Sequence, residues 1–164
     1  MKSKITRKAN IAAIAGLALA LMAPTASAQD KPANNMQVLA EKIKADKKMV
    51  VAANMGLTES EAKGFWPIYD AYQKDLAQLN GRLYKLIETY AGYYNSNSLT
   101  DAKAKELTDG AIAIEAAELD LKKSYLPKLY SALPAVKVAR YIQIENKIRA
   151  IVKLEIAAEV PLTP

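Results

Sequence analysis

Residues 65–93, FWPIYDAYQKDLAQLNGRLYKLIETYAGY, carry the pattern from which the fold can be predicted. Apolar or tyrosine side chains recur there at alternating steps of four and three residues, without a break. They are Phe65, Tyr69, Tyr72, Leu76, Leu79, Leu83, Leu86, Tyr90 and Tyr93, here called the seam. A helix with this 3.5-residue repeat has one continuous apolar stripe, which needs a partner helix to cover it. The stretch therefore predicts a long helix packed against a second helix.

The start of this helix is marked by residues 57–61, Leu-Thr-Glu-Ser-Glu. Thr58 is a good N-cap, and Glu61 stands three residues later, which together form a capping box. Pro67 lies inside the predicted helix and lacks the N–H that would bond to Lys63, so it predicts a kink. We expect the helix to span residues 59–94 and to end in the polar loop 95–98.

The next helix along the chain is predicted to begin after Thr100, which repeats the N-cap signal, and to contain about 30 residues. Pro127 inside it predicts another bend. Apolar residues form two rows along this helix, and a helix that is apolar on two sides is expected to lie between two neighbours. The first row contains Leu107, Ala111, Ile114, Leu121 and Tyr125, and the second contains Ile112, Ala116, Leu119, Leu126 and Tyr130.

Two further helices complete the prediction. One covers residues 36–54 and ends at Gly56, which can adopt the positive φ of a helix C-terminus. The other begins with Pro134 in its first turn and ends before Pro161. No segment shows the alternation of a strand, so residues 29–164 are expected to form a single all-α domain of four helices. Its short loops predict a long antiparallel helical hairpin.

The predicted hairpin is too long for a compact monomer. A helix over residues 59–94 is about 54 Å long, whereas a globule of this size is only about 37 Å across. The hairpin is therefore expected to bend at Pro67 and Pro127 into an open, cradle-like shape, and a second copy is expected to cover it. The sequence thus predicts a homodimer.

Residues 1–28 have the three parts of a secretory signal peptide. A basic start (Lys2, Lys4, Arg7 and Lys8) precedes the apolar run 11–23, and Ala26-Ser27-Ala28 supplies small residues for cleavage. The alternative is an uncleaved membrane anchor, but the apolar run is shorter than the approximately 20 residues that span a bilayer. We predict cleavage after Ala28, a periplasmic location and no stable membrane insertion.

Composition argues against several functions. Loss of the signal removes four basic residues and no acid, so the net charge falls from +6 to +2 and gives little support for a nucleic-acid partner. The chain contains no Cys and no His, which removes disulfides, the commonest general base and the usual haem and di-iron ligands. No Gly-rich phosphate loop is present. We therefore expect neither an enzyme nor a cofactor.

Acidic and aromatic residues leave alternatives open. Glu115 and Glu118 could meet Glu88 across the hairpin in a weak cation site, but a solvated face is the simpler interpretation, so no metal site is predicted. Trp66 is expected in the core. The tyrosines at the hairpin tip either pack against the helix that begins at Pro134 or a dimer mate, or they form a surface for a polypeptide partner. The second interpretation is possible because Tyr offers a large contact area at low entropic cost. The candidate surface comprises Tyr90, Tyr93, Tyr94, Tyr125 and Tyr130.

Residues 57–62, Leu-Thr-Glu-Ser-Glu-Ala, resemble the LTxxQ motif of the Spy/CpxP family of periplasmic stress proteins. That family repeats the motif near its last helix, where this chain has residues 133–137, Leu-Pro-Ala-Val-Lys. Glu61 stands in place of the first Gln, and Pro134 and Lys137 stand in place of the second Thr and Gln. The residues at the motif and helix-cap positions are Leu57, Thr58, Glu61, Leu133 and Pro134.

The resemblance implies a homodimer of long bent helices that form a thin cradle. It also implies a chaperone-like (holdase) or envelope-stress function, in which unfolded or misfolded polypeptides are bound without ATP. A regulatory module that docks on a sensor or another envelope partner is the main alternative, and a structural envelope subunit is another. Suppression of aggregation of unrelated clients would distinguish the first function from the others.

Overall fold

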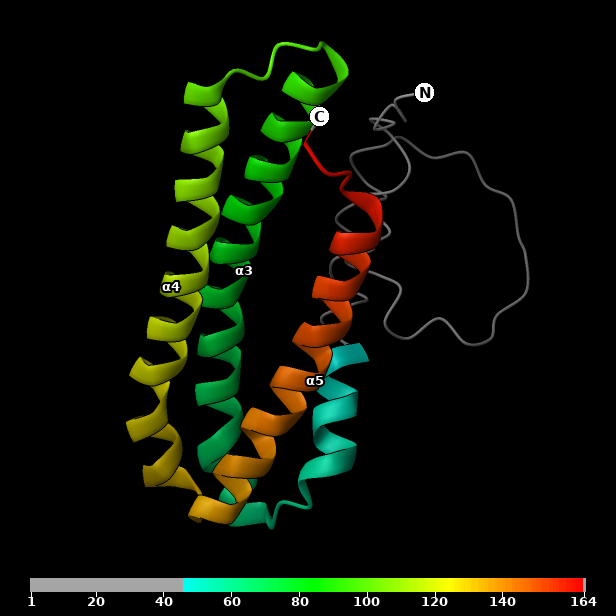
Figure 1. Ribbon diagram of the computed structural model, residues 1–164. Coiled ribbons are helices and arrows are strands. Elements are labelled where there is room, and N and C mark those ends of the chain that lie inside the picture. Colours follow the sequence, from blue (N-terminus) through cyan, green and yellow to red (C-terminus); the bar gives the residue numbers. More distant parts are fainter. Residues whose placement is uncertain (1–45, 164) are drawn as a thin grey trace, which may run out of the picture. The chain divides into compact units, whose positions relative to one another are not determined.

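The computed structural model describes residues 46–163, and its regular secondary structure is entirely α-helical (Figure 1). The long helices are α3 (Glu59–Asn95), α4 (Asp101–Ala132) and α5 (Ala135–Glu159), and residues 46–55 are also helical. The predicted all-α fold of four helices is confirmed. The predicted signal peptide and the first ten residues of the helix expected over 36–54 lie outside the described residues.

Helix α3 begins with the predicted capping box. The amide N–H of Thr58 donates to Glu61 Oε2 at 2.8 Å, and the amide N–H of Glu61 donates to Thr58 Oγ1 at 3.3 Å. The helix ends where the amide of Ser96 donates to the carbonyl of Gly92, and Asn97 turns the chain at φ 50°. Thr100 then caps α4 by accepting from the amide of Lys103 at 3.4 Å.

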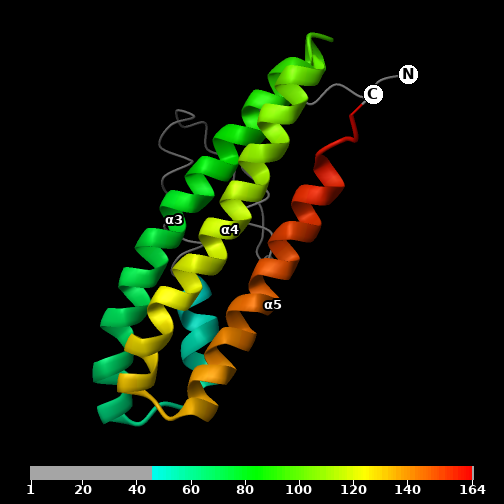
Figure 2. The same ribbon diagram turned by 60° about the vertical axis from the view of Figure 1, so that its left-hand side comes forward.

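Helices α3 and α4 lie side by side and antiparallel (Figures 1 and 2). Residues early in α3 meet residues late in α4, because a Cβ on Gly64 would lie 3.3 Å from that of Ala132. Further toward the turn, the rings of Tyr72 and Tyr125 are 5.3 Å apart. Close to the turn, Leu86 approaches Gly110, where a Cβ would meet the Leu86 Cδ1 at 2.9 Å. The two helices therefore stay in contact along most of their length.

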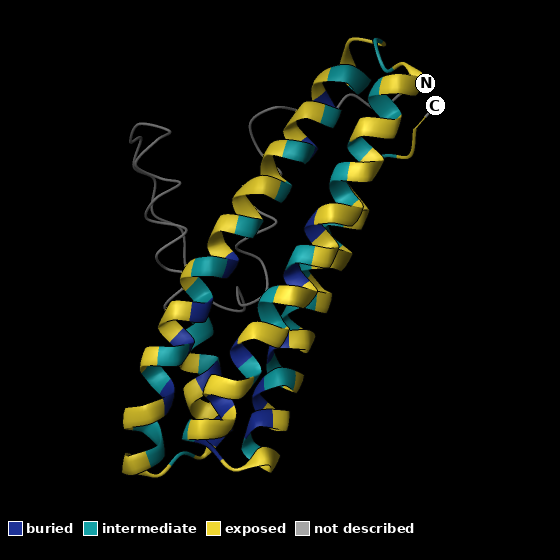
Figure 3. Cartoon of the chain, turned by 90° about the vertical axis from the view of Figure 1, so that its left-hand side faces the viewer, coloured by how far each residue is buried: buried dark blue, intermediate teal, exposed yellow. Residues whose placement is uncertain are grey.

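The seam is covered in its first half and opens in its second. Figure 3 shows buried positions recurring along the helices, and in α3 they are Phe65, Tyr69, Tyr72, Leu76, Ile87 and Ala91. Near the turn, Ile87 and Ala91 are buried, whereas the predicted seam residues Leu86 and Tyr90 are half-buried. The reason is geometric. A straight helix repeats every 3.6 residues, so a strict 3.5-residue pattern drifts by about 20° per heptad.

Only one of the two apolar rows of α4 is covered by the described residues. Ile114 and Tyr125 of the first row are buried, together with Leu129. The second row stands mostly in solvent, with Ile112 62% exposed, Leu119 52% and Tyr130 54%. Within the described part of the chain α3 covers one face of α4, and the expectation that a second neighbour covers the other face stays a prediction.

The two internal prolines do not end their helices. Pro67 lies within α3 and Pro127 within α4, and both are exposed. Exposure is compatible with proline because the carbonyl that loses its partner can bond to water instead. The bends and the cradle shape expected from these residues stay predictions, as does the single domain.

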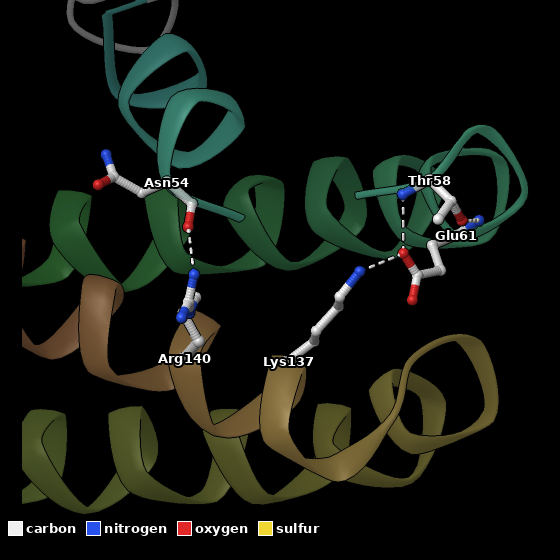
Figure 4. Close-up of polar contacts among 5 residues, drawn as sticks. All are labelled: Asn54, Thr58, Glu61, Lys137 and Arg140. Atoms are coloured by element: carbon white, nitrogen blue, oxygen red, sulfur yellow. Dashed lines mark hydrogen bonds and ion pairs between the residues drawn. The ribbon is translucent and has the colours of Figure 1, made fainter. Parts of the chain in front are cut away.

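Contacts among the described residues form two compact units, one of residues 57–139 and 161–163, the other of residues 46–56 and 140–160. In the second unit, the Lys47 ammonium lies 2.7 Å from Glu145 Oε2, and these side chains are 16% and 4% exposed. The helix over 46–55 ends before Gly56, whose φ of 55° fits the predicted C-terminal role. Arg140 donates to the carbonyl of Asn54 at 3.4 Å and so satisfies one end group of that helix (Figure 4).

Within residues 46–163, no helix is both long enough and apolar enough to cross a membrane.

Candidate functional site

The two motif segments meet through one ion pair, and we call this site the motif corner (Leu57, Thr58, Glu61, Leu133, Pro134 and Lys137). Figure 4 shows the ammonium of Lys137 pointing at the carboxylate of Glu61, with Nζ 2.5 Å from Oε2. The same oxygen accepts the amide N–H of Thr58. The two positions that carry Glu and Lys in place of Gln are therefore partners, which sequence comparison alone did not indicate.

Helix ends explain why the charges are arranged in this way. Glu61 lies in the first turn of α3, where the helix dipole favours an acid. Lys137 lies in the first turn of α5, where the dipole disfavours a cation, so the Glu61 carboxylate offsets an otherwise unfavourable placement. The hydrogen bond from Lys137 holds the pKa of Glu61 below its usual value, and the bond from the Thr58 backbone adds to this effect.

The other members of the corner shape the two helix starts. Leu133 is buried and Leu57 is half-buried. The carbonyl of Pro134 accepts the amides of Lys137 and Val138 at 2.9 and 3.1 Å, which begins α5. Thr58 and Pro134 are exposed. The corner therefore fixes the start of α5 to the start of α3, and its polar groups bond to one another within the protein.

The tip tyrosines, Tyr90, Tyr93 and Tyr94, are half-buried, and each has an intramolecular contact. The hydroxyl of Tyr90 donates to the carbonyl of Pro161 at 2.8 Å. The rings of Tyr90 and Tyr94 are 5.8 Å apart, and the ammonium of Lys103 lies 4.1 Å from the centre of the Tyr93 ring. Burial, and secondarily Tyr94, raises the pKa of Tyr90. These contacts favour a packing role for the tip.

Tyr125 does not belong to the predicted polypeptide-binding surface, and that assignment is corrected here. It is buried, because it lies in the row of α4 that faces α3. Its hydroxyl donates to Asp75 Oδ2 at 2.7 Å, and the Lys128 ammonium lies 4.4 Å from its ring centre. The bond to Asp75, followed by burial, raises the pKa of Tyr125 to about 12. Tyr125 therefore joins the two helices, whereas Tyr130 faces solvent.

The exposed second row of α4 is a regular apolar feature of which only Tyr130 was assigned to binding by sequence analysis. We call it the outer row: Ile112, Ala116, Leu119, Leu126 and Tyr130. Leu126 is half-buried and the other four are exposed. Their 3.5-residue spacing was interpreted as a packing face, and periodicity alone does not say whether such a face is covered. The sequence did indicate that one row could remain uncovered, because a hairpin supplies α4 with one neighbouring helix, whereas α4 carries two apolar rows.

The described residues contain no group of three or more acidic side chains placed to hold a metal ion. Of the three glutamates considered as a weak cation site, Glu118 is buried and its carboxylate lies 3.9 Å from the Lys122 ammonium. Glu88 and Glu115 are exposed. The structure of this part of the chain therefore favours the solvated-face interpretation for Glu88 and Glu115, and an ion pair for Glu118.

Comparison of the chain with protein-family models, curated proteins and solved structures found no match.

Proposed function

We propose that this chain is an exported protein that binds non-native polypeptides without ATP, as the resemblance to the Spy/CpxP family implies. The observation that carries the proposal is the exposure of large apolar side chains on all three long helices. Tyr84 on α3 is 43% exposed, Leu119 on α4 52% and Leu154 on α5 71%. Single exposed apolar residues are normal, but contiguous exposed apolar rows mark interaction surfaces.

Charged residues around these side chains support a holding role rather than a single tight interface. On α4, exposed ion pairs join Lys105 to Asp109 and Asp120 to Lys123, close to the outer row. Charges of both signs keep an apolar surface soluble while it remains uncovered. An apolar surface without fixed polar partners can accept many sequences weakly, which is what a carrier of non-native chains requires.

The proposal includes export and dimerisation. The signal-like residues 1–28 support export to the periplasm as part of the proposal, and the length of α3, with its 37 residues, supports a second copy. Mass spectrometry of protein from the cell envelope should find Gln29 at or near the N-terminus. Sedimentation at micromolar concentration should give twice the mass of one mature chain. An intact Met1 or a clean monomer would contradict these two parts separately.

Aggregation assays test the function itself. Mature protein is added, without nucleotide, to several chemically denatured proteins that are unrelated to one another, and light scattering is followed after dilution. We expect slower aggregation of most clients at near-stoichiometric ratios, and no such effect from an inert protein of similar charge. If no client is affected, holding fails as a function, and the regulatory module that docks on one envelope partner becomes the better hypothesis.

A further inference from the structure

We infer that the outer row of α4 is a polypeptide-binding site, and that its occupant is one short, apolar, uncharged segment of a non-native chain. This inference rests on the proposed function and adds a location and a ligand. Its first support is exposure: Ile112, Leu119 and Tyr130 have more than half of their surface in solvent. Ala116 between them is also exposed, so the row is accessible along its length.

The second support is that α4 cannot rotate to bury the row. Its opposite face is fixed to α3 by the hydrogen bond from Tyr125 to Asp75 and by the close approach of Gly110 to Leu86. Ile114 and Leu129 are buried on that same face. Turning α4 to hide the outer row would expose these side chains and break the hydrogen bond. The outer row is therefore a fixed feature of the hairpin surface.

Size indicates the kind of occupant. The row extends over residues 112–130, or about 27 Å of helix, which matches about eight residues of extended chain. Its three large side chains each expose on the order of 100 Å², since such residues present about 200 Å² when free. The sum, about 300 Å², is well below the approximately 800 Å² per partner of a stable complex. The row alone suits weak capture of a short segment better than a stable dimer.

Charge indicates the composition of the occupant. The acid Asp109 is paired with Lys105 at 2.5 Å, and Asp120 is paired with Lys123 at 3.7 Å. Lys123 occupies the position of the row between Leu119 and Leu126, and its charge is paired there with Asp120. Both pairs are exposed and each is neutral as a whole, so they offer no net charge to attract a charged ligand. A segment with charges at its centre would have to desolvate them against apolar side chains without a partner. The preferred ligand is therefore apolar.

The test compares two triple variants of the mature protein. The row variant carries Ile112→Ser, Leu119→Ser and Tyr130→Ser, and the control carries Met49→Ser, Val136→Ser and Leu162→Ser. Both remove three exposed apolar side chains. Binding of a fluorescent ten-residue peptide of Leu, Val and Ala with polar ends is measured by anisotropy. We expect the row variant to bind at least tenfold more weakly, the control to stay within twofold, and a peptide with central Asp residues to bind neither.

A second measurement does not depend on the folding of a triple variant. Because the chain has no cysteine, Leu119→Cys or Leu162→Cys provides a unique attachment point for a photoreactive label, and both positions are exposed. The peptide should crosslink to the label at 119 and only weakly to the one at 162.

Equal crosslinking at the two positions, or full peptide binding by the row variant, would show that the outer row is not the binding site. Either result would leave aggregation suppression by the wild type, and therefore the proposed function, unaffected. Loss of dimer mass in the row variant would identify a second copy as the occupant and also overturn the inference. Failure of the wild type to slow aggregation of any client would instead remove the proposed function itself.

Discussion

The ammonium of Lys137 lies 2.5 Å from Glu61 Oε2 and joins positions 76 residues apart in the chain. At these two positions, residues 57–62 and 133–137 carry Glu and Lys where the LTxxQ motif that they resemble has Gln. Two glutamines at this site could share a neutral hydrogen bond, and the Glu–Lys pair replaces it with a charge-assisted one. The two departures from the motif are therefore complementary, since either alone would place a half-buried charge beside an amide.

A double-mutant cycle tests this complementarity. Glu61→Gln and Lys137→Gln should each lower the free energy of unfolding, because each leaves the other charge without its partner. The double variant, with Gln at both positions, should lose less than the sum of the two single losses. Urea unfolding followed by circular dichroism measures all four proteins. Additive losses would show that the two side chains do not stabilise one another.

Lowering the pH should remove the stability that the Glu61–Lys137 ion pair contributes at the motif corner. Lys137 and the Thr58 backbone hold the pKa of Glu61 below its usual value of 4.5. A carboxylate with a lowered folded pKa contributes stability above its unfolded pKa and loses it as the pH falls through the folded value. We expect the wild type to lose stability relative to Glu61→Gln as the pH falls below about 4.5. Urea unfolding between pH 7 and pH 3 measures this, with Glu59→Gln as the control from the same turn.

Tyr125→Phe should lower the free energy of unfolding by about 1 kcal/mol, since it removes the buried hydroxyl that donates to Asp75. The pKa of Tyr125 is raised from 10.0 to about 12, so its contribution is complete below pH 10 and is lost as the pH rises toward 12. Absorbance titration should show one tyrosine ionising with a pKa of about 12, and the variant should lack that step. Tyr130→Phe, at an exposed site, should leave stability nearly unchanged.

Two glycines should respond differently to alanine. Gly81 lies inside α3 with no neighbouring atom within 4 Å of a built Cβ. Gly81→Ala should therefore raise the free energy of unfolding by about 0.5–1 kcal/mol. Gly110→Ala gains the same helix propensity but places a methyl 2.9 Å from the Leu86 Cδ1, so it should gain less or lose stability. Thermal unfolding of both variants compares them, and an equal gain would mean that Leu86 moves aside at no cost.

Local chemistry allowed the helix starts to be predicted, because a cap needs only neighbours in sequence. Thr58 with Glu61, and Thr100, cap α3 and α4 as expected. The seam was predictable in its first half. In its second half the burial of Ile87 and Ala91 depends on the drift between a 3.5-residue pattern and a straight helix, which a heptad count does not contain.

Contacts between distant residues were not predictable in this way. The sequence assigns Tyr125 both to the first apolar row of α4 and to a binding surface, and only the position of α3 shows which role it has. The bond from Tyr90 to Pro161 joins residues 71 apart, and nothing in either local sequence indicates it. The pairing of Glu61 with Lys137 also joins distant residues and was not predicted. The sequence did contain an indication of it, because both residues stand where the resembled motif has Gln.

The order of contacts along the hairpin has a consequence for folding kinetics. Leu86 meets Gly110 close to the turn, Asp75 meets Tyr125 across 50 residues, and Glu61 meets Lys137 across 76. Each contact encloses the previous one, so a chain that nucleates at residues 96–100 can zip toward the motif corner at little additional loop entropy. The contacts of the motif corner then form late in folding. Removing the Lys137 ammonium should accordingly speed unfolding while leaving the refolding rate almost unchanged.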